Sequence, residues 1–305
     1  MSKHGALRDL TEWALVWPVL KTLEILPLPL ARLKARALAG LLRLATPRLV
    51  RVARRNLAMA MPELSEAQRE AIVKGVYRSL GRSLLAFARF PRLSRTNIEQ
   101  WIRYEGFEHF KKAWECGRGI LFLTAHVGNW ELSALAHGLY GYPLHIVVRS
   151  LDNPYLDRLV ACYRTFSGNR IIEKTETPRR ILEALRANHA VGMLIDQNAS
   201  PENGAFVDFF GVQACASTGL VKIALRTGAV VLPGFALWEQ KERRYVLRFW
   251  PPIEMKQTGD PEADVTINTQ RTHKVLEEII RQYPDQWLWI HRRWKTRPPG
   301  EAPIY

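Results

Sequence analysis

Hydrophobic residues in the last two-thirds of the chain fall into short runs that alternate with segments of helical period. Runs of this length are typical of buried strands, and strands that alternate with helices build a parallel sheet covered by helices. The pattern therefore predicts an α/β fold with a mostly parallel central sheet flanked by helices. The predicted strands are residues 119–125, 144–148, 190–195, 229–233 and 245–250, and the predicted helices are 154–166, 178–188, 218–227 and 264–283.

The first hundred residues show only the helical period. In residues 56–89, Pro62 breaks the pattern and Ser65 is placed to cap a helix whose apolar stripe belongs to the core. We therefore divide the chain into three parts. These are N-terminal membrane-associating helices (1–45), a helical region (46–100) and an α/β domain (101–305) that holds the candidate chemistry.

The most apolar stretch of the chain, Trp13–Leu20, is followed by Lys21 and Glu24, which makes a clean membrane span doubtful. A cleaved signal peptide is also disfavoured, because Asp9 and Glu12 precede the apolar part. Read as a helix, the next segment is amphipathic and predicts a helix lying at a membrane interface. The alternative is a core helix with a solvated basic face. The apolar face holds Leu33, Ala37, Leu38, Leu41 and Leu42, and Arg32, Arg36 and Arg43 lie opposite.

The positive net charge of the chain indicates an anionic partner or surface. The chain has 44 Lys and Arg against 29 Asp and Glu, a net charge of +15, and residues 32–55 hold eight basic residues and no acidic one. A hydrophobic content of 47% excludes disorder. Cys116, Cys162 and Cys215 are too far apart for a zinc-finger spacing or a disulfide framework.

Candidate chemistry follows the first strong strand, where His126 and Glu131 are five positions apart. In parallel sheets the ligand crevice lies beyond the carboxyl ends of the strands. A carboxylate in the first helical turn can hold the imidazole so that its other nitrogen is a free base, with Gly128 allowing a tight turn and Asn129 capping the helix. A capping Glu131 with a hydrogen-bonded core His126 is the structural alternative.

Asp196 and Gln197 leave a second strand end and are predicted to line the same crevice, or to form an ordinary turn. Backbone N–H groups of residues 128–131 are candidate donors to an oxyanion. The chain offers no GxSxG serine and no HExxH zinc motif, so we predict no metal and no cofactor.

The segment from His126 to Glu131 reads HVGNWE and resembles the HxxxxD/E motif of the lipid A biosynthesis lauroyl/myristoyl acyltransferases, the late acyltransferases of lipopolysaccharide synthesis. The resemblance extends over about residues 50–298. Only the loop 198–204 departs from the usual aspartate- and tyrosine-containing stretch. The matching segments are Arg55–Leu57 with Met61–Glu63, Asn153–Pro154, Ile195–Gln197, Phe206–Gly211, Ser217–Thr218, Tyr283–Trp289 and His291–Lys295.

The resemblance implies a membrane-bound O-acyltransferase on the cytoplasmic side of the cell inner membrane. Such an enzyme moves a fatty acyl chain from acyl carrier protein to a hydroxyl of a glycolipid, here a lipid A precursor. It also points to Arg149 and Arg164 as substrate-binding residues, beside Asn129, Asp196 and Gln197. The acyl chain length and the position acylated stay open.

Two alternatives remain at this point. One is a related acyltransferase acting on another lipid or glycolipid hydroxyl. The other is a basic nucleic-acid-binding protein, because Trp287, Trp289 and Trp294 interleave with basic residues near the C-terminus. No RRM, KH or helix-turn-helix signature supports it, so we predict no nucleic-acid partner. The same tryptophans would also suit headgroup-level anchors in a membrane.

Overall fold

The structure is a computed structural model that describes residues 5–173 and 177–305. Its centre is a seven-stranded sheet with strand order β1-β9-β8-β2-β5-β3-β4. All neighbouring pairs are parallel except β8 and β9, which run antiparallel. The strands are β1 (Ile102–Glu105), β2 (Ile120–Thr124), β3 (Leu144–Val148), β4 (Arg170–Glu173), β5 (Ala190–Leu194), β8 (Val230–Glu239) and β9 (Arg244–Phe249).

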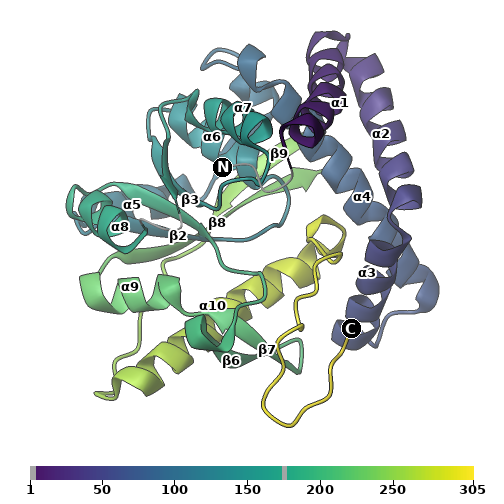
Figure 1. Ribbon diagram of the computed structural model, residues 1–305. Coiled ribbons are helices and arrows are strands. Elements are labelled where there is room, and N and C mark those ends of the chain that lie inside the picture. The colour runs from purple at the N-terminus through teal and green to yellow at the C-terminus, as the bar shows by residue number, and fades with distance from the viewer. Residues whose placement is uncertain (1–4, 174–176) are drawn as a thin grey trace.

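Helices cover both faces of the sheet (Figure 1). One face packs in a core cluster with α5 (Phe107–Glu115), α6 (Trp130–Leu139) and α7 (Pro154–Thr165). The other packs against α8 (Thr177–Arg186), α9 (Gly219–Thr227) and α10 (Pro261–Gln282). Alternate residues of each strand supply the two clusters: Leu121 and Leu123 belong to one, Ile120 and Phe122 to the other.

The predicted α/β architecture is confirmed, and each predicted strand and helix of the sheet region is present. Strand β8 is longer than expected, because it continues past Pro233 to pair with β9. The sequence pattern missed β1, β4 and the hairpin of β6 (Gly204–Phe209) and β7 (Val212–Ser217). Strands β1 and β4 have four residues each, and in each strand only one residue is buried. They therefore carry almost no hydrophobic signal.

Four helices precede the sheet and stand together beside it, at the right of Figure 1. They are α1 (Ala6–Ile25), α2 (Leu28–Ala45), α3 (Pro47–Ala60) and α4 (Glu66–Ala88). The predicted break and cap are confirmed: α3 ends before Pro62, and Ser65 caps α4 through its side chain and the N–H of Gln68. The division of the chain at residues 45 and 100 stays a prediction, although the first strand begins at Ile102.

Helix α2 turns its small residues inward and its large ones outward. Ala31, Ala35 and Ala39 are buried, and the backbone of Ala35 comes so close to Gly81 of α4 that a Cβ there would lie 2.9 Å from the Ala35 carbonyl oxygen. The small side chains let the helices approach, and the leucines on the opposite side of α2 are left exposed. Leu33, Leu41 and Leu44 are 64%, 62% and 74% exposed.

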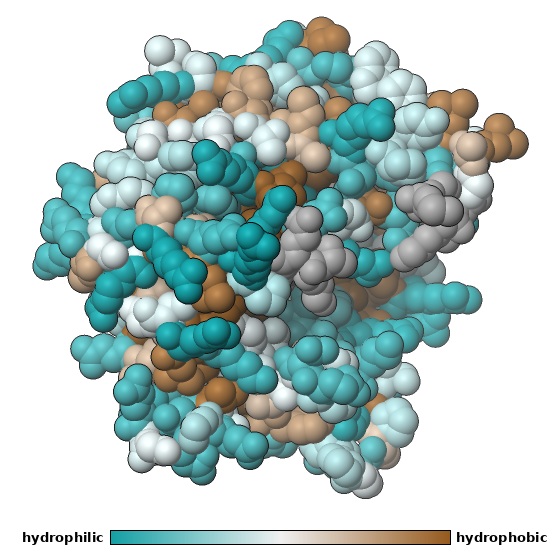
Figure 2. All heavy atoms as spheres, turned by 60° about the vertical axis from the view of Figure 1, so that its left-hand side comes forward, coloured by the Kyte–Doolittle hydropathy of each residue, from teal (hydrophilic) through white to brown (hydrophobic). Residues whose placement is uncertain are grey.

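Exposed large hydrophobic residues concentrate in this part of the molecule. Of the fifteen found among the described residues, twelve precede residue 50, and the other three, Leu151, Tyr155 and Phe166, lie in or beside α7. Helix α7 contacts α1, and Asn153 ties them by donating to the carbonyl of Asp9. Figure 2 shows apolar side chains protruding at the upper right, on the side of the N-terminal helices. Within residues 5–173 and 177–305, no helix is both long and apolar enough to span a membrane.

The tryptophans near the C-terminus are core residues. Trp287, Trp289 and Trp294 are at most 2% exposed and pack against the phenylalanines of the β6–β7 hairpin. The idea that they stack bases or anchor the chain at headgroup level is therefore wrong, because their rings are not available to an outside partner.

Candidate active site

His126 lies where the chain leaves β2 and turns into α6. The turn depends on Gly128, whose φ is +65°. Its missing side chain leaves room for β8, the neighbour of β2 in the sheet, because a Cβ at this position would lie 1.9 Å from the carbonyl oxygen of Ala236. Asn129 caps α6 by accepting from the N–H of Leu132 at 3.0 Å. Both roles were predicted from the sequence, and both are confirmed.

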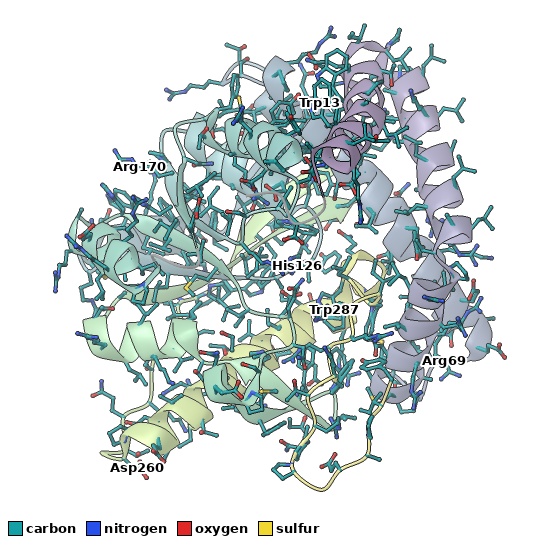
Figure 3. All side chains as sticks on the ribbon, viewed as in Figure 1. Trp13, Arg69, His126, Arg170, Asp260 and Trp287 are labelled. Carbon is teal, nitrogen blue, oxygen red and sulfur yellow. The ribbon has the colours of Figure 1, made fainter. Side chains whose placement is uncertain are left out.

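A buried carboxylate holds the imidazole of His126. Asp196 follows the neighbouring strand β5, and its Oδ1 lies 2.9 Å from Nδ1 of His126. Its Oδ2 accepts from the backbone N–H of His126 at 3.0 Å and from Nε1 of Trp287 at 2.8 Å. Figure 3 shows His126 and Trp287 near each other in the middle of the molecule. Three donors therefore fix Asp196, and Asp196 fixes His126.

The electrostatics of this pair assign the protons. Burial alone would raise the pKa of Asp196, but the charge and hydrogen bond of His126 and the donor of Trp287 lower it to about 2. Asp196 is therefore ionised at neutral pH and accepts the Nδ1 proton, so neutral His126 carries its lone pair on Nε2. Burial lowers the pKa of His126, yet the charge and hydrogen bond of Asp196 and the charge of Glu131 outweigh it and raise that pKa above its ordinary value.

Glu131 is paired with Arg164 of α7. Its two carboxylate oxygens accept from Nε and Nη2 of Arg164 at distances from 2.5 to 3.2 Å, and both side chains are about four-fifths buried. Burial lowers the pKa of Arg164, and the hydrogen bonds and charge of Glu131 more than restore it. The hydrogen bond that we predicted between His126 and Glu131 is replaced by one that His126 donates to Asp196, since the adjacent strand end brings Asp196 directly behind the ring.

The remaining predicted site residues are spread over the crevice. The side-chain nitrogen of Gln197 is 3.5 Å from Nε2 of His126, on the open side of the ring. The side chain of Arg149 is largely exposed, and its Nη2 lies 3.4 Å from Oδ1 of Asp152. Asn129 is buried behind the turn as a helix cap, so its predicted part in substrate binding stays a prediction.

These residues surround one large cavity. It has a volume of about 1140 Å³ and is lined by His126, Glu131, Arg149, Arg164 and Gln197, whereas Asp196 and Asn129 support it from behind. Beyond this polar group the lining is mostly apolar and comes from β2, β3, β5, β8, β9 and the helices on both faces of the sheet. The structure therefore brings five of the seven predicted residues to one cavity.

The predicted oxyanion donors need a correction. The N–H of Gly128 donates to the carbonyl of Gln286 at 3.0 Å, and the N–H of Asn129 donates to the carbonyl of Ala236 at 2.9 Å. Both N–H groups already donate to backbone carbonyls that hold the turn, so they are not available to an oxyanion. Trp130 and Glu131 are the first two residues of α6, where N–H groups have no partner within the helix.

Sequence reasoning missed two supports of the site. Trp287 donates to Asp196. The negative charge of Asp196 also attracts the positive charge of buried Arg293 and raises the pKa of that guanidinium, but burial outweighs this effect and lowers the pKa to about 10. Both come from the C-terminal segment, more than ninety positions away. Among the residues that the structure describes, no three His, Cys, Asp or Glu side chains converge as ligands of a metal ion would.

Comparison with known proteins points in one direction. The family described as "Bacterial lipid A biosynthesis acyltransferase" matches residues 1–296. The lipid A biosynthesis palmitoleoyltransferase of Escherichia coli (strain K12) is 29% identical over 255 residues, which cover 83% of this chain and 81% of the relative. The lauroyltransferase of the same organism is 29% identical over 85% of this chain and 83% of its own length. For the myristoyltransferase the values are 25%, 82% and 76%.

Proposed function

Because the chain belongs to the bacterial lipid A biosynthesis acyltransferase family, we propose that it transfers a fatty acyl chain from an acyl carrier protein thioester to a hydroxyl of a lipid A precursor. The observation that carries the proposal is the geometry of His126: Nδ1 is held by a buried carboxylate, and the ring borders a large, mostly apolar cavity. A lipid substrate and a hydroxyl-activating base require this combination.

His126 is the general base. Its Nε2 takes the proton of the acceptor hydroxyl as the oxygen attacks the thioester carbonyl carbon. Asp196 keeps the ring in the correct tautomer and stabilises the imidazolium that forms. The tetrahedral intermediate then collapses, the carbon–sulfur bond breaks, and the imidazolium returns its proton to the leaving thiolate. The product is an ester and a free thiol, so the atoms and charges balance.

The oxyanion of the intermediate needs donors on the same side of the ring. Gln197 lies beside Nε2, and the N–H groups of Trp130 and Glu131 begin α6, where the helix dipole favours negative charge. Arg164 is a nearby cation, and Glu131 both positions it and contributes negative charge that raises the pKa of His126. We assign Glu131 and Arg164 to this supporting role.

The N-terminal helices and α7 supply a surface for a lipid bilayer. Exposed leucines of α1 and α2 adjoin basic residues of α2 and α3, the combination expected of a surface that lies on anionic headgroups. Leu151 is 44% exposed and also lines the cavity, so one residue of the apolar surface borders the cavity. A glycolipid in the inner membrane would reach His126 from there, with the cytoplasmic carrier protein approaching from outside.

The test uses purified full-length protein in detergent, an acyl carrier protein thioester and a lipid A precursor. We expect wild-type transfer and a loss of roughly 10²- to 10⁴-fold with His126→Ala. Folding should be unaffected because the ring borders a cavity instead of filling the core. Transfer that survives His126→Ala would refute the mechanism. If transfer occurs only to a hydroxyl of a different lipid, the proposed acceptor is wrong.

Membrane association is tested on the full chain with vesicles that contain anionic lipid. Replacing Leu33, Leu41 and Leu44 by glutamine should weaken binding by at least about 10-fold, because each side chain loses apolar burial in the bilayer. Replacing the same three by methionine keeps the surface apolar and serves as the matched control. Equal binding of both variants would contradict the assignment of this surface.

A further inference from the structure

The cavity has two branches on opposite faces of the sheet. Phe122, Gly192 and Ile146 are direct neighbours in one row across β2, β5 and β3, and all three line the cavity on the side of α6. Met193 and Val147 are the next residues along two of these strands, so they point to the opposite face, toward α9. We call these the α6-side branch and the α9-side branch.

Gly192 leaves a gap in the wall of the α6-side branch. A Cβ built on it would meet only the carbonyl oxygen of His145, at 4.0 Å. Gly234, another strand glycine of the same branch, differs, because the rings of Phe249 and Phe122 fill the space of its missing side chain, at 3.3 and 3.5 Å. Glycine inside a strand costs stability, and it often marks a place where a ligand approaches the backbone.

The α6-side branch has the chemistry of a hydrocarbon site. Leu144, Ile146, Leu247 and Phe249 line it. Its inner end includes His137, which burial keeps neutral by lowering its pKa to about 3, and whose Nδ1 is 2.5 Å from the hydroxyl of Tyr104. A long uncharged chain can therefore enter without burying a charge.

We propose that the acyl chain of the donor lies in the α6-side branch and that Gly192, because it has no side chain, admits chains longer than about ten carbons. This inference rests on the proposed acyl transfer and adds the residue that selects the substrate. The family alone does not decide the length, since relatives of similar identity are named for palmitoleoyl, lauroyl and myristoyl groups.

The register of the sheet gives the expected cut-off. Gly192 pairs with Phe122, four positions before His126, so at about 3.3 Å per residue it lies about 13 Å along the sheet from the base. Carbon–carbon bonds of about 1.5 Å advance an extended chain by a little more than 1 Å each. A side chain at position 192 would therefore obstruct acyl chains longer than about ten carbons.

The experiment measures kcat/KM for a series of saturated acyl carrier protein donors, from about 8 to about 16 carbons, with one acceptor. Gly192→Val should lower the value for donors longer than about ten carbons by at least about 10-fold and leave shorter donors within about 2-fold. Gly192→Ala should shift the profile in the same direction by less. Valine favours strands, so the melting temperature of both variants should equal or exceed that of wild type.

Gly219→Val is the matched control. Gly219 lines the α9-side branch and also has room, with Ser217 Oγ and the terminal carbon of Met193 at 3.7 and 3.9 Å from an added Cβ. It should leave the preferred length unchanged. The inference is overturned if Gly192→Val folds and keeps the wild-type profile, or if Gly219→Val shortens the preferred chain instead. Absence of transfer by wild type with every donor would overturn the proposed function itself, and this inference with it.

Discussion

Two carboxylates flank His126, and their surroundings differ. Behind the β2–β5 wall of the cavity, Asp196 is 2% exposed and accepts three hydrogen bonds, two of them from His126 itself. On the α6–α7 wall, Glu131 is partly exposed and accepts from a single guanidinium, that of Arg164. The contrast teaches that burial and the number of donors decide which carboxylate can orient an imidazole, whereas a short sequence spacing does not.

Removing the buried carboxylate should break the site most severely. In Asp196→Asn, the side chain still fills its place but no longer favours the tautomer with a free Nε2, so we expect kcat to fall by roughly 10²- to 10⁴-fold with little change in KM. Steady-state kinetics with one donor and one acceptor measure this. A variant that melts like wild type and retains activity within about 3-fold would refute the role of Asp196.

Neutralising the other carboxylate should cost less. Glu131→Gln breaks the pair with Arg164 and leaves a mostly buried guanidinium uncompensated near His126, so we expect a loss of about 10- to 10²-fold in kcat/KM. Glu183→Gln is the matched control, because it removes a surface pair with Arg179 and should be almost neutral. A larger loss of activity in Glu131→Gln than in Asp196→Asn would contradict the greater importance that we assign to Asp196.

The smallest expected effect is a displacement of the pH profile. A general base must be neutral, and the pKa of His126 is raised, so kcat/KM should fall as pH drops through a midpoint above the ordinary pKa of histidine. Glu131→Gln removes one of the charges that raise this pKa and should move the midpoint to lower pH by a fraction of a unit. A midpoint that stays in place would show that Glu131 does not act on His126 through its charge.

Much of this architecture could be predicted from the sequence because its signals are local. Apolar runs identified β2, β3, β5 and β9, and the position of His126 after such a run identified the crevice. The partner of His126 could not be identified in this way. Asp196 is 70 positions away, and it reaches the ring only because β5 is the neighbour of β2, an order that the hydrophobic pattern does not contain.

The N-terminal helices illustrate the same limit. The predicted leucine face of α2 holds in part, since Leu33, Leu41 and Leu42 are exposed whereas Leu38 packs toward the core, and periodicity alone does not tell which face packs on the protein. The structure resolves this through Ala31, Ala35 and Ala39, which allow close approach to α4 and so turn the leucines outward. Small residues carry a weak hydrophobic signal, but they decide the orientation of this helix.

The central claim is that Asp196 holds His126 with its proton on Nδ1 and a free Nε2. NMR of protein labelled with ¹⁵N-histidine measures this directly, with the His126 signals assigned by their loss in His126→Gln. We predict the Nδ1–H tautomer at high pH and a pKa above the ordinary histidine value in wild type, with a lower pKa and a mixture of tautomers in Asp196→Asn. An Nε2–H tautomer in wild type, or a pKa unchanged by Asp196→Asn, would contradict the account.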